Sequence, residues 1–378
     1  MTKRSLSIQI ILFCAYIFIF FLLFLIMPDV GFSDQENREL TQAPQFSFEN
    51  LFAEKFTTKF ESYTTDQFPF RDEWTTVKAR TELLLGKKEN KGVFLCAGDT
   101  LIEAYVKPDS EQLQTNINAV SSLVDNVDVP VYFCLIPGVA EICSDLLPAN
   151  APNDSQKDVI DYCYNGSGAQ NIDMYSALAA HSDEYIYYRT DHHWTSLGAF
   201  YGYQAIMKAM DKPSAPITDF NRKTVTTEFY GTVYSKSGMS WVKPDEIEVF
   251  VPENADTKVI NYYKAEPEET SLYDYTFLEK KDKYSMFLGG ISPLVKVSTG
   301  AQDAPSLLIL RDSYTDSLVP FLQNDFSEIH LMDLRYYKTQ LYESSLEEYV
   351  KDNNIDIVLV CYSASNFGTD SNVSLMGN

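Results

Sequence analysis

Two short segments of the 378-residue chain carry side chains that could together perform acyl transfer. The segment Thr-Asp-His-His-Trp at 190–194 sets two of only four histidines beside an aspartate, and Ser313 follows a short apolar run much later. A serine hydroxyl needs an imidazole to accept its proton and a carboxylate to fix the tautomer of that imidazole. We therefore predict Ser313 as nucleophile, Asp191 as orienting carboxylate, and His193 or His192 as base, because spacing alone does not choose between the histidines.

The position of Ser313 suits a nucleophile. The apolar run 306–310 predicts a buried strand, which leads directly into Arg311-Asp312-Ser313-Tyr314 and a helix. In parallel α/β sheets, reactive groups gather beyond the carboxyl ends of the strands, and a helix N-terminus favours developing negative charge. The alternative is that Ser313 only caps the helix.

The aspartate and histidines at 191–193 could instead bind a metal ion or simply pack at the start of a helix. A metal site needs further ligands, and the sequence places no third or fourth ligand nearby and has no C-x-x-C or H-x-x-x-H spacing. We therefore expect no metal and no cofactor.

The surrounding sequence alternates between helical patterns and short apolar runs, as in parallel α/β sheets. The predicted helices are 110–124, 156–164, 174–180, 196–210 and 344–352, and the predicted strands are 129–136, 185–188, 306–310, 328–332 and 356–360. Residues 213–285 interrupt this alternation with several prolines and β-type patterns. We interpret them as an inserted β-rich lobe.

The motif Asp191-His192-His193-Trp194 resembles the signature of the bacterial DHHW proteins, relatives of the alginate O-acetyltransferases. The resemblance extends to Glu36-Asn37-Arg38-Glu39-Leu40, to the segment 66–72 (DQFPFRD), and to Asp312-Ser313-Tyr314. In the alginate enzymes, an Asp-x-His-Trp sequence supplies the acid and base of a triad, and a later Asp-Ser pair supplies the nucleophile. The resemblance thus implies Asp191, His193 and Ser313.

The catalytic domains of these relatives resemble SGNH hydrolases, which carry serine, glycine, asparagine and histidine after successive strands. Here Asn366 follows strand 356–360, where the oxyanion asparagine would lie, whereas the Asp-x-His segment comes earlier in the chain. The resemblance therefore implies a circularly permuted SGNH-like sheet. The expected glycine is missing and Arg335 lies near its position. Arg335 and Tyr314 are weaker candidates for binding substrate, and Asn366 could equally be an ordinary loop residue.

Residues 8–27 contain a single polar side chain, Gln9, and are long enough to cross a bilayer. Lys3 and Arg4 precede this segment, so the rest of the chain is expected outside the cytoplasm. A cleaved signal peptide is the alternative, but the apolar run is long and no A-x-A-like site follows. The expected organisation is a cytoplasmic N-terminus (1–7), an anchor (8–27), a stalk and helical lead-in (28–90), and a catalytic domain (91–378).

The formal net charge of −23 argues against nucleic acid and against a basic membrane-binding patch. Six cysteines, with Cys14 in the anchor, leave an odd number outside and predict no disulfide framework. By resemblance, the function is an extracytoplasmic O-acetyltransferase acting on a polysaccharide, with a membrane-bound O-acyltransferase supplying acetyl groups. A carbohydrate acetyl esterase with the same triad, and a non-catalytic polysaccharide-binding or assembly protein, are the alternatives.

Overall fold

The computed structural model describes residues 3–52, 55–252, 257–263, 266–340 and 344–377. It divides into two compact units, Met1–Lys91 with Tyr234–Trp241, and Gly92–Val233 with Val242–Asn378. The candidate residues at 191–193, 313, 314, 335 and 366 all belong to the second unit.

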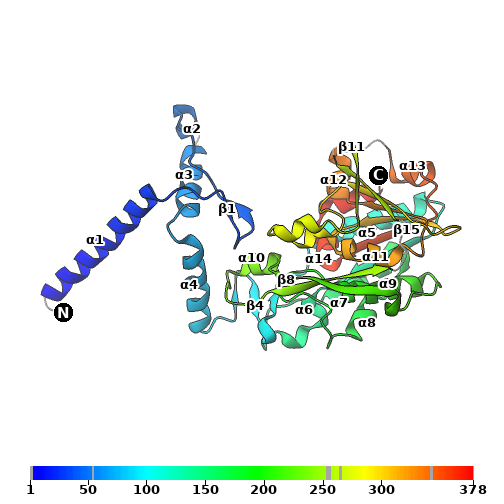
Figure 1. Cartoon of the computed structure of the whole chain (residues 1–378), viewed down its shortest axis with the longest axis horizontal. Helices are drawn as coiled ribbons and strands as arrows, with labels where there is room; N and C mark the ends of the chain where they lie inside the picture. The colour runs from blue at the N-terminus through cyan, green and yellow to red at the C-terminus, as the bar shows by residue number, and fades with distance from the viewer. Residues whose placement is uncertain (1–2, 53–54, 253–256, 264–265, 341–343, 378) are drawn as a thin grey trace. The chain divides into compact units, whose positions relative to one another are not determined.

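The second unit is built on a mostly parallel eight-stranded sheet of order β11-β10-β12-β14-β13-β15-β6-β7 (Figure 1). The parallel strands are β6 (Val131–Ile136), β7 (Gln170–Asn171), β13 (Ser306–Arg311), β14 (Glu328–Met332) and β15 (Ile357–Ser363). Three antiparallel strands extend one edge, namely β10 (Lys258–Tyr263), β11 (Glu266–Thr270) and β12 (Leu294–Ser298). The fold is therefore mixed α/β, as the alternation of helices and strands predicts.

Helices cover both faces of this sheet because its central strands are apolar on both sides. In β13, Leu307 and Ile309 pack into one core cluster, whereas Leu308 and Leu310 pack into another. The first cluster is covered by α6 (Val139–Ile142), α8 (Met174–Ala179), α9 (Ser196–Ala209) and α11 (Val319–Leu322). The second is covered by α5 (Ser110–Asn126), α7 (Gln156–Ser167), α13 (Leu346–Asp352) and α14 (Ala364–Thr369). Burial of both faces explains the continuous apolar runs in the sequence.

Most predicted elements are confirmed within a few residues, and two differ. Residues 185–188 form no ladder, only an isolated bridge between Tyr187 and Trp194. The predicted helix at Ser313 begins as a 3-10 turn, η6 (Ser313–Ser317), before the short α11. Pro320 at the start of α11 lacks an N–H group and therefore cannot extend a regular helix back toward Ser313.

The segment 213–285 is divided between two sheets. β8 (Phe220–Phe229) and β9 (Asp245–Pro252) form a separate antiparallel pair, whereas β10 and β11 lie at the edge of the main sheet. Before them, β4 (Val93–Leu95) and β5 (Leu101–Glu103) form a short hairpin. All six cysteines are free.

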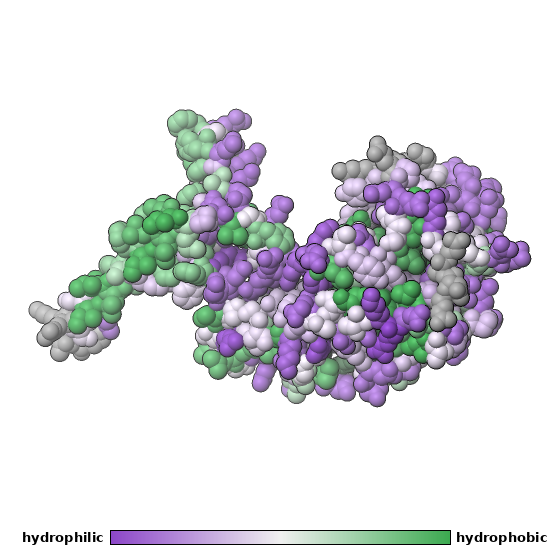
Figure 2. Space-filling model, viewed as in Figure 1, coloured by the Kyte–Doolittle hydropathy of each residue, from purple (hydrophilic) through white to green (hydrophobic). Residues whose placement is uncertain are grey.

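The first unit contains α1 (Lys3–Ile26), α2 (Phe48–Phe52), α3 (Lys55–Asp66) and α4 (Arg71–Leu84). Within α1, Ser5–Ile26 is long and apolar enough to cross a membrane, a property that signal sequences share. Figure 2 shows its hydrophobic exterior.

Ion pairs join the two early segments of the family resemblance. Arg38 pairs with Asp66 at 2.6 Å, and Arg71 pairs with Glu36 at 2.5 Å. These partly buried pairs hold residues 36–40 against the end of α3 and the start of α4.

His330 on β14 should make the fold sensitive to acid. Burial and the nearby Lys296 lower the pKa of His330 to about 4. The unfolded chain, with a histidine pKa of about 6.5, takes up this proton first as the pH falls, so stability present above about pH 6.5 is lost progressively toward pH 4. The free energy of unfolding can be measured with urea on the full chain in detergent. Between pH 7 and 4.5 it should fall by about 2 kcal/mol less in His330→Gln than in the wild type. Equal losses in both proteins would contradict this assignment.

Candidate active site

A tight loop between Tyr187 and Trp194 presents the Asp-His-His segment. The loop is closed by hydrogen bonds from Tyr188 N to His193 O (3.2 Å) and from Thr195 N to Ile186 O (2.9 Å). At its tip, Asp191 Oδ1 accepts the backbone N–H of His193 at 3.0 Å. This local turn also brings the same oxygen to within 2.6 Å of His193 Nδ1.

The second carboxylate oxygen of Asp191 is held by Thr232, which donates its backbone N–H at 2.8 Å and its hydroxyl at 3.1 Å. Burial acts to raise the pKa of Asp191, but the imidazoles of His192 and His193 and the hydrogen bonds from His193 and Thr232 outweigh it and hold the pKa well below its usual range. Asp191 is thus an ionised carboxylate aimed at His193.

Ser313 completes a continuous chain of hydrogen bonds. Its Oγ lies 2.8 Å from His193 Nε2, the ring nitrogen opposite the one that faces Asp191. Ser313 is partly exposed, whereas Asp312 and Tyr314 on either side are buried. The structure therefore brings together the three residues expected to form a triad and leaves the serine accessible.

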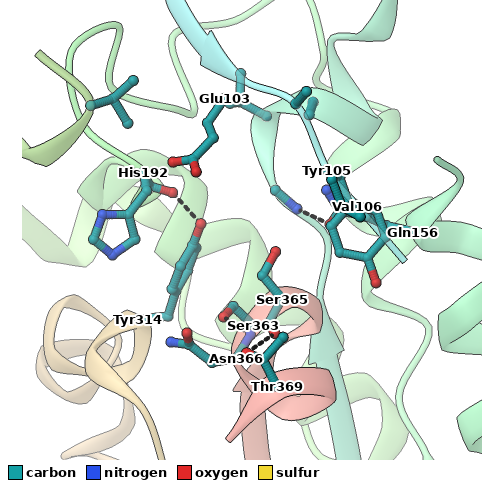
Figure 3. Close-up of a pocket in the computed structure, with 15 residues that line it drawn as sticks. Glu103, Tyr105, Val106, Gln156, His192, Tyr314, Ser363, Ser365, Asn366 and Thr369 are labelled. Atoms are coloured by element: carbon teal, nitrogen blue, oxygen red, sulfur yellow. Dashed lines mark hydrogen bonds between the residues drawn. The ribbon is translucent and has the colours of Figure 1, made fainter. Parts of the chain in front are cut away.

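Reciprocal hydrogen bonds join the loop to the turn that carries Ser313. The buried indole of Trp194 donates from Nε1 to the Tyr314 carbonyl at 2.9 Å. The Tyr314 hydroxyl in turn donates to the carbonyl of His192 (Figure 3). Each segment thus satisfies a backbone acceptor of the other, which fixes their relative position.

The family model described as DHHW protein matches residues 92–332, which hold the Asp-His-His-Trp motif and Ser313. The chain belongs to this family. Among solved structures it is similar to a DHHW family protein from Eubacterium siraeum (26% identity, covering 77% of this chain and 96% of the other, TM-score 0.66). It is also similar to Bacillus cereus PatB1 with a sulfonyl adduct (22% identity, 74% and 97% covered, TM-score 0.61).

A more distant likeness is to the O-acetyltransferase domain of Pseudomonas putida AlgJ (14% identity, 73% and 92% covered, TM-score 0.48). Among curated proteins, none matches the chain. The comparisons thus establish the family and the fold.

In this DHHW protein, Tyr284 is a site residue that sequence reasoning missed. Its ring stacks on the imidazole of His193 with centroids 3.8 Å apart and planes 7° from parallel. Its hydroxyl donates to the Ser313 carbonyl at 3.0 Å. Tyr284 belongs to the segment interpreted as an inserted lobe and is one of 25 tyrosines, so no sequence signal distinguished it.

Thr232 and Gly231 were also missed. A β-carbon at Gly231 would lie 2.2 to 2.6 Å from atoms of the Asp191 side chain, so the carboxylate needs a glycine there. The signal available was a glycine between an aromatic residue and a threonine, which by itself indicates only a turn.

Asn366 is hydrogen-bonded to Asp312, the residue before Ser313. Asp312 Oδ2 accepts hydrogen bonds from Asn366 Nδ2 at 2.9 Å and from the backbone and hydroxyl of Ser363 at 2.8 Å each. The buried Asp312 therefore ties the start of the Ser313 turn to the start of α14.

Arg335 and His192 have other partners than Ser313. The guanidinium of Arg335 makes two hydrogen bonds to Asp333, at 2.9 and 2.6 Å. His192 directs Nδ1 to the Thr232 hydroxyl at 2.6 Å, so His193 is the histidine that meets the serine.

Asp191, His192 and His193 also bring possible metal-ligand atoms within 4.8 Å of one another. Both ring nitrogens of His193 already bond to protein, Nδ1 to Asp191 and Nε2 to Ser313, and both carboxylate oxygens of Asp191 accept hydrogen bonds. The donor set therefore fits a hydrogen-bonded series better than a metal centre.

Replacing Tyr284 tests its role in positioning His193. Tyr284→Leu removes the stacking ring and should lower kcat for an acetyl ester about tenfold with little change in KM, because only the base is misplaced. Tyr284→Phe keeps the ring and should restore most of kcat. Equal defects in both variants would show that stacking is not the important contact.

Gly231→Ala should act through Asp191 alone. The added methyl group forces the carboxylate away from His193, and kcat should fall by roughly 100-fold or more. Gly31→Ala provides the control, because a β-carbon there meets no atom within 4 Å. An unchanged kcat in Gly231→Ala would mean that Asp191 does not orient the base.

Proposed function

We propose that this chain is an extracytoplasmic O-acetyltransferase that moves an acetyl group through Ser313 to a hydroxyl of a polysaccharide. The observation that carries the proposal is the unbroken series Asp191, His193 and Ser313, with contacts of 2.6 and 2.8 Å. The 2.8 Å contact also supports a catalytic role over a purely binding or assembly role.

The reaction has two steps. His193 Nε2 accepts the Ser313 proton as Oγ attacks the acetyl carbonyl, and then returns that proton to the departing donor group. The acceptor hydroxyl attacks acetyl-Ser313 and loses its proton to the same nitrogen, which passes that proton to the departing Ser313 Oγ as the acetyl ester forms. Asp191 stabilises the imidazolium present between these transfers.

The oxyanion formed in each step needs hydrogen-bond donors. The backbone N–H of Ser313 lies at the start of η6, just after β13. The amide nitrogen of Asn366 carries two hydrogens, one of which is donated to Asp312, so the other can bond to substrate. We assign these two groups to the oxyanion hole. This assignment fits a permuted SGNH-like sheet, in which β13 carries the serine and the adjacent parallel β15 leads to the asparagine.

Helix α1 supports a single-pass anchor that leaves the catalytic unit outside the cytoplasmic membrane. One helix cannot carry acetyl groups across a bilayer, so a membrane-bound O-acyltransferase is the proposed donor partner. The second candidate is a carbohydrate acetyl esterase, because the partial exposure of Ser313 also admits water.

The full-length protein in detergent should release p-nitrophenol from p-nitrophenyl acetate, and Ser313→Ala should reduce this by at least about 1,000-fold. Ser121→Ala, on α5, is the matched control. Intact mass spectrometry should detect one acetyl group on the wild type and none on Ser313→Ala. Equal rates in wild type and Ser313→Ala would refute the triad. An added oligosaccharide that gains the mass of an acetyl group would indicate transfer. Release of acetate with no such gain would indicate hydrolysis.

A further inference from the structure

The connection between α3 and α4 carries exposed aromatic side chains. Phe68 and Phe70 lie in this connection on either side of Pro69, and Trp74 lies in the first turn of α4. Phe68, Phe70 and Trp74 are 40%, 49% and 41% exposed, and we call these three side chains the aromatic tip. The tip belongs to the first unit, whereas the residues of the candidate active site belong to the second.

The backbone at Phe70 is strained. Its φ of 60° and ψ of 38° are left-handed, which is unusual for a residue with a bulky side chain. Strain of this kind persists at binding and switch sites. Here it accompanies a side chain that leaves about half of its apolar surface exposed.

The tip contacts the helix that is long and apolar enough to cross a membrane. The ring of Phe68 stacks on that of Phe20 in α1, with centroids 5.5 Å apart and planes 7° from parallel. The ring of Trp74 lies 5.9 Å from that of Phe20, and the ring of Tyr63 in α3 lies 5.6 Å from that of Phe24. Phe20 and Phe24 are half-buried, whereas most of α1 is exposed. The first unit therefore packs on α1 through aromatic rings.

The place of Phe20 within α1 sets the depth of the tip. The candidate span Ser5–Ile26 has 22 residues, which at about 1.5 Å per residue matches a hydrocarbon core of about 30 Å. Phe20 lies six residues before Ile26, or about 9 Å from that end of the span. Rings that pack on Phe20 must then lie in the hydrocarbon of the same leaflet.

The charged residues beside the tip are compatible with this placement. Asp66 and Arg71 flank it, and they pair with Arg38 at 2.6 Å and with Glu36 at 2.5 Å respectively. Paired charges cost less to bring near lipid than isolated ones. Glu73 adds an exposed acidic group next to Trp74, so a zwitterionic lipid surface suits the tip better than an anionic one.

Resting on the single-pass anchor proposed above, we propose that the aromatic tip inserts into the outer leaflet of the bilayer beside α1 and holds the first unit at the membrane. Tryptophan and phenylalanine side chains favour the interface of a bilayer, and their exposed apolar surface gains free energy on leaving water. A free stalk would instead keep residues 28–90 clear of the lipid.

Tryptophan fluorescence tests the insertion, because the chain has three tryptophans. Trp194 is fully buried in the second unit, and the guanidinium of Arg80 lies over the ring of Trp241 at 4.7 Å. The full-length protein is reconstituted into phosphatidylcholine vesicles with and without bromine on one acyl chain, since bromine quenches tryptophan only on contact. The brominated lipid should reduce wild-type fluorescence by roughly one third, the share of one tryptophan in three.

Two tryptophan variants assign the quenched residue. Trp74→Phe keeps an aromatic ring in the tip and should abolish the quenching, whereas the matched control Trp241→Phe should retain it. Unquenched wild type, or equal quenching in Trp74→Phe and wild type, would overturn the proposal. The vesicles hold no other protein, so a tip that binds only a partner protein would stay unquenched and the proposal would fail.

A charge placed on the tip should withdraw it from the lipid. Phe70→Asp should reduce the quenching of Trp74 at least about twofold, because a carboxylate is costly in hydrocarbon. Ile291→Asp is the control, since Ile291 is 57% exposed but belongs to the second unit, and it should keep the wild-type quenching. Full quenching in Phe70→Asp would contradict insertion of the tip.

Alkaline carbonate extraction of the same vesicles tests the anchor separately. Protein that stays with the vesicles while Trp74 is unquenched keeps its anchor and loses the inserted tip, whereas protein that is extracted loses both. Release of p-nitrophenol in detergent tests the triad and depends on neither result. The failure of this proposal is thus distinct from the failure of the proposed function.

Discussion

The candidate active site depends on one reciprocal interaction between two segments about 120 residues apart. Trp194 donates to the Tyr314 carbonyl, and Tyr314 donates to the His192 carbonyl. Each buried acceptor would lose its partner if the segments separated, which is costly away from water. These two hydrogen bonds hold the loop that carries His193 against the turn that carries Ser313, and the two side chains meet at 2.8 Å.

The same interaction explains why tryptophan follows the two histidines. Trp194 is fully buried, and its ring lies so close to α9 that a β-carbon at Gly202 would come within 2.7 Å of it. A smaller aromatic residue would leave a cavity there and lose the indole donor. The motif therefore has two parts. Asp191 and His193 form the hydrogen bonds that reach Ser313, and Trp194 binds the segment to the turn that carries Ser313.

Local interactions and the pairing of Ser313 with His193 could be predicted from the sequence, whereas the other distant contacts of the site could not. The helices and buried strands follow from periodicity, and Asp191 reaches His193 through a turn of three residues, so both could be inferred. Tyr284 and Thr232 reach the same residues through contacts that only the folded sheet creates. Asn366 follows β15 but lies in the first turns of α14, and its bond to Asp312 depends on the neighbouring strand.

Two buried carboxyl groups near His193 have opposite electrostatic character. Hydrogen bonds and imidazoles keep Asp191 ionised, whereas burial raises the pKa of Asp316 to about 7 even though Arg311 and His193 act to lower it. A proton on His193 would therefore be stabilised mainly by Asp191, the carboxylate with direct contact to its ring. Arg311 bonds to Asp316 through Nη1, whereas its buried Nε and Nη2 have no hydrogen-bond partner among the described residues.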